Sequence, residues 1–167
     1  MDLDPDTLYI ALSARNEEGS YHWGLVLPLT RTTCIYYHAT FGSETGGKWE
    51  SRFIEQPLPM RSRALIMLWK VGAIHAKSNS INDELVKFMG GISADGSPSK
   101  RTGRDFNCRV WVMDSLAKLG EESLVPVALA FDEIEATAFE HANSVENEVV
   151  KGERGPLVVN DDAIARM

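Results

Sequence analysis

The chain is poor in cysteine and poor in positive charge, and each shortage excludes a class of protein. Only 2 of its 167 residues are cysteines, too few for a disulfide framework, so we expect free thiols whose roles are packing or chemistry. Lysine and arginine number 17 against 24 acidic residues, which gives a net charge of -7. Because nucleic-acid binding depends on clustered cations, we expect no nucleic-acid partner. The one basic cluster, Lys100, Arg101 and Arg104, falls in a polar loop and is interpreted as a solvated segment.

Long apolar runs are also missing. No stretch approaches the ~20 apolar residues that a membrane-spanning helix needs. The first residues include Asp2, Asp4 and Asp6 rather than a basic segment followed by an apolar one, so we predict a cytoplasmic protein without a membrane span. Composition is in the globular range, and we predict one domain over residues 1–167 with an ordered core at about 5–150. The C-terminal tail and the oligomeric state are left open.

The first half of the chain has the alternation and turn residues of β-strands. We predict strands at 7–14, 21–27, 33–41 and 48–56, with a short hairpin connection at 28–32 and a glycine-containing turn at 42–47. The apolar run within 64–74 fits a buried strand or a short buried helix, and we favour the strand.

The second half changes to helical spacing. Ser80 or Asn82 can cap a helix that ends before Gly90, and Asn107 can cap a second helix that Gly120 closes. A final helix is predicted from near Asp132 towards residue 150, after an apolar segment at 124–130 that fits a last strand or an extended arm. The predicted fold class is therefore α+β, an antiparallel sheet of about five strands with about three helices.

Two histidines and one cysteine form the candidate site. If the hairpin turns about Thr30, paired residue numbers sum to 60, which places His22 opposite His38 on one face of the sheet. One imidazole can then orient the other, as the base is oriented in a catalytic triad. Cys108 begins a helix, where unpaired N–H groups and the positive end of the dipole favour a thiolate and can hold an oxyanion.

These motifs resemble those of the circularly permuted papain-like proteins, including the lecithin-retinol acyltransferase-like thiol proteins. The similarity covers residues 21–119: His-Trp-Gly-Leu-Val-Leu on one strand, Tyr-Tyr-His on the next, and Asn-Cys-Arg-Val-Trp at a helix start. Small fungal proteins with a His-Trp strand and an Asn-Cys-Arg-x-Trp helix are also similar. The resemblance implies a permuted papain-like fold, with Cys108 as nucleophile, His22 as general base and His38 as orienting residue. The chain departs from the family in having Arg109 after the cysteine and no apolar anchoring tail.

We therefore predict a cysteine hydrolase or acyltransferase that acts through Cys108, His22 and His38 on a small-molecule or peptide amide, ester or thioester. Trp23, Trp111 and Asn107 are candidate substrate contacts, although core packing is the better prediction for the two tryptophans. One alternative is a binding or regulatory protein on the same scaffold. A weaker alternative is a Cys/His metal protein that also uses Cys34, because the spacing of these residues matches no metal-binding motif. We therefore expect no cofactor and a role for Cys34 in the core.

Overall fold

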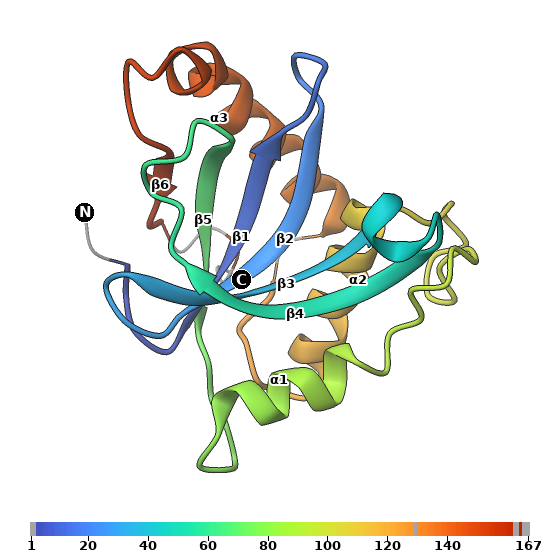
Figure 1. Cartoon of the computed structure of the whole chain (residues 1–167). Helices are drawn as coiled ribbons and strands as arrows, with labels where there is room; N and C mark the ends of the chain where they lie inside the picture. Colours follow the sequence, from blue (N-terminus) through green and yellow to red (C-terminus); the bar gives the residue numbers. More distant parts are fainter. Residues whose placement is uncertain (1–2, 129, 162–163, 165–167) are drawn as a thin grey trace.

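The fold is built on a single curved sheet, seen in a computed structural model that describes residues 3–128, 130–161 and 164 (Figure 1). The sheet has six strands in the order β4-β3-β2-β1-β5-β6. Their bounds are β1 Thr7–Ala14, β2 Tyr21–Pro28, β3 Thr33–Phe41, β4 Trp49–Pro57, β5 Leu65–Ala73 and β6 Leu157–Val159. All neighbouring strands are antiparallel except β5 and β6, which are parallel.

Three α-helices follow the first five strands: α1 Ile81–Met89, α2 Cys108–Glu121 and α3 Phe131–Lys151. Helices α2 and α3 lie behind the sheet in Figure 1, and α1 crosses below it. Side-chain caps start two of them, since Ser80 Oγ accepts the Asp83 amide and Asn107 Oδ1 accepts the Val110 amide. The two predicted cap positions, Ser80 and Asn107, are confirmed, whereas Asn82 lies inside α1.

The sheet has two differently covered faces. One face packs against the helices in the main core, which contains the large buried rings Trp23, Trp69 and Trp111. The other face holds a smaller buried cluster around Tyr9, Val26, Cys34 and Leu68. Strand alternation therefore decides which side of the sheet each β2 and β3 side chain faces.

The hairpin of β2 and β3 has a different register from the predicted one. Paired residues run from Leu25↔Tyr37 to Pro28↔Cys34, so their numbers sum to 62 rather than 60. The turn is centred one residue later, where Thr30 Oγ1 accepts the amides of Thr32 and Thr33. Within the described residues, no pair joins 21–24 of β2 to 38–41 of β3, so the two strands separate at that end.

The α+β class is confirmed, with one strand more than expected. The segment 64–74 contains the strand β5, as favoured, and the described part of 124–130 forms no strand. The tail contributes β6, and Ile164 is buried and accepts the Ala128 amide. Among the described residues, no helix is long and apolar enough to cross a bilayer.

Candidate functional site

Cys108 occupies the first position of α2, directly after the Asn107 cap. The side chain is 3% exposed, and its sulfur accepts two hydrogen bonds. The Trp23 amide lies 3.5 Å from Sγ, and Nη2 of Arg15 lies 3.4 Å from it. A cationic donor, a backbone donor and the positive end of a helix thus converge on one sulfur.

The separation of β2 and β3 explains how a helix residue reaches a strand amide. Trp23 lies in the part of β2 that forms no pair with β3, so its amide is available on that side. Cys108 Sγ takes the acceptor position that a β3 carbonyl would otherwise fill. The sulfur therefore lies at the slot between the two strands.

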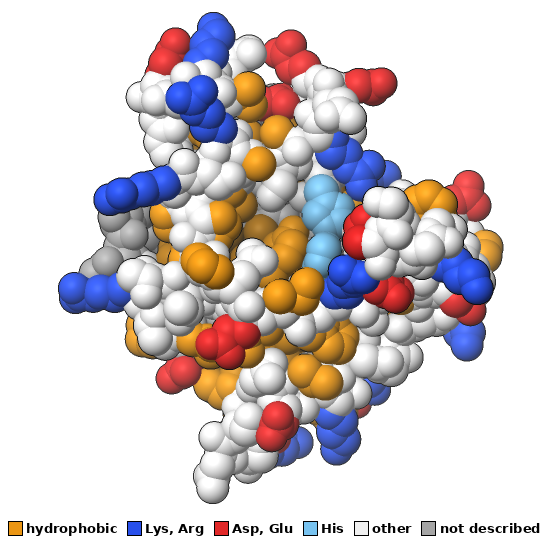
Figure 2. Space-filling view, in the orientation of Figure 1, with side chains coloured by type: hydrophobic (Ala, Val, Ile, Leu, Met, Phe, Trp, Pro, Cys, Tyr) orange, Lys and Arg blue, Asp and Glu red, His pale blue; other side chains and the backbone are white. Residues whose placement is uncertain are grey.

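His22 and His38 form a hydrogen-bonded pair on the same sheet. His22 Nε2 and His38 Nδ1 are 2.7 Å apart, and the rings meet edge to face. The predicted contact is confirmed, but the two residues are diagonal neighbours because of the shifted register. A view of the sheet face opposite α2 and α3 shows histidine side chains beside a hydrophobic hollow (Figure 2).

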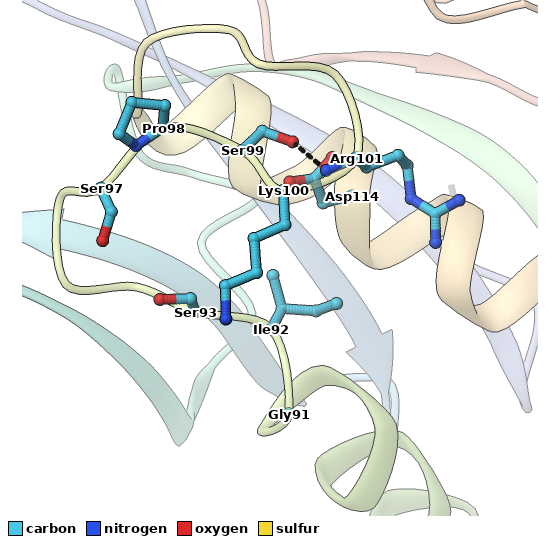
Figure 3. A pocket seen from close by; sticks show the side chains of 9 residues that line it. All are labelled: Gly91, Ile92, Ser93, Ser97, Pro98, Ser99, Lys100, Arg101 and Asp114. Carbon is cyan, nitrogen blue, oxygen red and sulfur yellow. Dashed lines mark hydrogen bonds between the residues drawn. The ribbon is translucent and has the colours of Figure 1, made fainter.

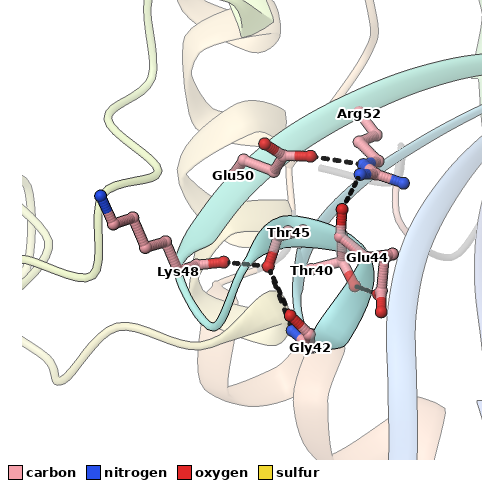
Figure 4. Close-up of polar contacts among 7 residues, drawn as sticks. All are labelled: Thr40, Gly42, Glu44, Thr45, Lys48, Glu50 and Arg52. Carbon is pink, nitrogen blue, oxygen red and sulfur yellow. Dashed lines mark hydrogen bonds and ion pairs between the residues drawn. The ribbon is translucent and has the colours of Figure 1, made fainter.

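Burial lowers the pKa of both imidazoles to about 4, so both are neutral at neutral pH. The neighbouring His38 and Arg15 lower the pKa of His22 further. For His38, Arg52 lowers the pKa and Glu44 opposes that effect. Arg52 is held next to His38 by Glu50 at 2.5 Å and by the Glu44 carbonyl at 2.9 Å (Figure 4).

The structure does not join the thiol to the histidine pair by a hydrogen bond within the described residues. Alternation along β2 turns Tyr21, Trp23 and Leu25 toward the helices, in the same core as Cys108, and turns His22 toward the other face. The predicted hydrogen-bond contact of Cys108 with His22 is therefore absent, and the sulfur is bonded to Arg15 and Trp23 instead.

Tyr36 packs against both β2 and the histidine pair. Its ring lies on the histidine face and packs against the His38 ring, with 4.6 Å between centroids and a tilt of 36°. Burial raises the pKa of Tyr36, and the charge of Cys108 across the sheet raises it further. A Cβ on Gly24 would lie 2.6 Å from the Tyr36 ring, so the glycine of His-Trp-Gly is what lets the ring fill this place.

Two pockets open at the site, and Arg15 lines both. One has a volume of about 230 Å³ and includes Cys108, Trp23 and Asn107 in its walls. The other, of about 440 Å³, is lined by His22, Phe41 and Trp49. Arg15 thus stands between the thiol and the histidine pair.

The remaining predicted residues have varied positions. Trp23 and Asn107 line the thiol pocket, whereas Trp111 is fully buried, packs near Phe53 and lines none of the described pockets. Cys34 is also fully buried, as expected, and burial raises its pKa to about 11. The described residues contain no cluster of three or more His, Cys, Asp or Glu that could hold a metal ion.

Sequence reasoning missed Arg15 and Tyr36. Arg15 follows the last residue of β1 in a polar turn, where an exposed arginine carries no signal of its own. Two of the basic loop residues turn out to be ion-paired, Arg101 with Glu121, and Arg104 with Asp132 and Glu135.

Comparison with known proteins adds no relative to this description. No family model, no curated protein and no solved structure matches the chain.

Proposed function

We propose that the protein performs thiol-dependent acyl chemistry on an amide, ester or thioester, with Cys108 as the nucleophile. The observation that carries the proposal is the pair of donors on Cys108 Sγ, the Trp23 amide and the Arg15 guanidinium, at the start of α2. A cysteine that only filled the core would need neither a cation nor a helix terminus. Its pocket provides room for an acyl group beside the sulfur.

In the proposed reaction His22 accepts the thiol proton. If the neutral ring donates its Nε2–H to His38 Nδ1, its own Nδ1 has a free lone pair. Because His22 lies on the face of the sheet opposite to Cys108, the proposed transfer requires a bridging water or a reorientation of the His22 ring through the slot between the unpaired ends of β2 and β3. His38 then orients the base through the 2.7 Å contact.

The thiolate would attack the carbonyl carbon, forming a C–S bond while the carbonyl oxygen becomes an oxyanion. The Cys108 and Arg109 amides of the first turn of α2 can hold that oxyanion, because the Val110 amide donates to the Asn107 side chain and the Trp111 amide to the Asn107 carbonyl. Collapse breaks the bond to the amine, alcohol or thiol, which leaves with the proton from His22. Water or a second nucleophile then releases the acyl group from Cys108.

A binding or regulatory protein is the second candidate. Two observations favour it: the thiol is 3% exposed, and it makes no hydrogen bond to His22 among the described residues. In that case the hydrogen bonds from Arg15 and Trp23 to Cys108 would serve only to hold the start of α2 against the sheet.

Alkylation of the folded protein by iodoacetamide, followed by peptide mass spectrometry, separates the two candidates. We expect Cys108 to react at pH 7 and the buried Cys34 to stay unmodified, with Cys108→Ser removing the signal. His22→Ala should slow the reaction about tenfold at pH 7 and little at pH 9.5, where the thiolate forms without a base. His38→Ala should have a smaller effect in the same direction.

The matched control is His75→Ala, which removes an exposed histidine outside the site. A packing defect caused by His22→Ala would change the rate by the same factor at both pH values. Equal rate profiles for wild type and His22→Ala, or an inert Cys108, would overturn the catalytic proposal in favour of the binding protein.

A further inference from the structure

A third pocket lies away from the thiol and the histidines. It has a volume of about 460 Å³ and is formed where the loop after α1 folds over α2 (Figure 3). It shares no lining residue with either pocket of the candidate site. Its lining residues are Gly91, Ile92, Ser93, Ser97, Pro98, Ser99, Lys100, Arg101 and Asp114.

Asp114 is the unusual member of this lining. Its side chain comes from α2, is 7% exposed, and its Oδ1 atom is buried without a hydrogen-bond partner among the described residues. A buried carboxylate oxygen without a donor is strongly unfavourable, so such groups are normally paired or hydrogen-bonded. The wall of the pocket therefore contains a carboxylate with an unsatisfied oxygen, and a ligand cation or N–H group that approaches Asp114 can offset that cost.

Two cations line the same pocket, and they differ in their partners. The Arg101 guanidinium forms an ion pair with Glu121, at 2.5 and 3.1 Å, and points away from the pocket in Figure 3. The Lys100 side chain runs along the pocket past Ile92 toward Ser93, and it forms no ion pair among the described residues. The pocket is thus lined by one cation without an ion pair among the described residues and by a carboxylate that interacts electrostatically with Arg101 but has one oxygen without a hydrogen bond.

We propose that this pocket binds a small zwitterion, an amino acid or a related amino carboxylate. The ligand ammonium would pair with the Asp114 carboxylate, and the ligand carboxylate would contact Lys100 Nζ. The hydroxyls of Ser93 and Ser97 both donate to Asp95, so toward the ligand they can offer only acceptor lone pairs. The site does not depend on Cys108 chemistry and stands whether or not the thiol is reactive.

Isothermal titration calorimetry with defined probes tests the proposal. The probes are glycine, 4-aminobutyrate and 6-aminohexanoate, which vary the separation of the charges, with butylamine and butyrate as single-charge controls. We expect saturable binding of at least one amino acid and at least tenfold weaker binding of both single-charge compounds.

Variants assign that binding to the pocket. Asp114→Asn and Lys100→Ala should each weaken it about tenfold or more, whereas Asp105→Asn and Lys48→Ala, at exposed positions outside the lining, should leave it unchanged. Lys100 is exposed, so its variant reports on binding even if Asp114→Asn impairs folding. No saturable binding of any amino acid, or full affinity retained in Lys100→Ala and in a folded Asp114→Asn, would overturn the proposal. Equal affinity for butylamine would overturn its zwitterion specificity.

Discussion

Ser115 is a hydroxyl enclosed in the middle of α2. Its side chain is fully buried, and its Oγ has no hydrogen-bond partner among the described residues. An unsatisfied buried hydroxyl opposes folding, and serine is also a poorer helix former than alanine. We therefore predict that Ser115→Ala raises the free energy of unfolding by about 1 kcal/mol, measured by urea denaturation. Ser144→Ala, at an exposed position of α3, should raise it less, and a loss of stability at Ser115 would show that the oxygen is satisfied after all.

The residues of the two sites differ in how far their roles could be predicted from the sequence. Cys108 was identifiable because Asn107 marks a helix start and places the thiol at a position with a known electrostatic effect. Arg15 was not, because its role depends on the sulfur of a residue 93 positions away. Asp114 was hidden too, since a carboxylate within a helix gives no sign of burial until the loop after α1 covers it.

At the scale of elements, α2 depends on its cap. The Asn107 side chain accepts the Val110 amide at 2.9 Å, and the same turn holds Cys108. Asn107→Ala removes this bond and should lower the free energy of unfolding by about 1 kcal/mol, while Asn107→Asp and Asn107→Ser should retain most of it. Chemical denaturation of the three variants provides the measurement. Equal losses in all of them would mean that the amide group, rather than capping, stabilises this turn.

The hairpin shows what alternation can and cannot predict. A register sum of 60 or of 62 puts the same residues on each face, because the two differ by two positions. The pattern therefore predicted that His22 and His38 share a face but could not distinguish direct from diagonal neighbours. It also gave no indication that residues 21–24 of β2 form no pair with β3, which leaves the Trp23 amide to Cys108.

At the scale of the whole molecule, the least predictable feature is the edge strand that the C-terminal tail adds to the sheet. Strand β6 has only three residues, and it pairs in parallel with β5 after the long helix α3. The Trp69 indole adds a 3.0 Å bond to Asp161 just beyond it. Three apolar residues are too few to show an alternating pattern, so β6 could be recognised only from its pairing with β5.

The free energy of unfolding should depend on pH because the histidine pair is partly buried in the folded protein. Burial lowers the pKa of His22 and His38 from 6.5 to about 4, while the unfolded chain keeps the ordinary value. Between these values the unfolded state binds more protons, so this contribution to stability is complete above pH 6.5 and is lost as the pH falls toward 4. His22→Gln combined with His38→Gln should therefore flatten the pH dependence in that window.

Urea unfolding of wild type and the double variant at pH 7.5, 6.0 and 5.0 measures the effect. Between pH 7.5 and 5.0 the free energy of unfolding should fall further in the wild type than in the double variant. Because solvent reaches the partly exposed rings, we expect this extra loss to be on the order of 1 kcal/mol per histidine. The neighbouring charges Arg15, Arg52 and Glu44 are present in both proteins, so the difference isolates the two imidazoles. Parallel pH profiles would mean that the pair protonates in the folded protein as readily as in the unfolded chain. The neutral His22 that the acyl-transfer proposal requires would then be partly protonated near neutral pH.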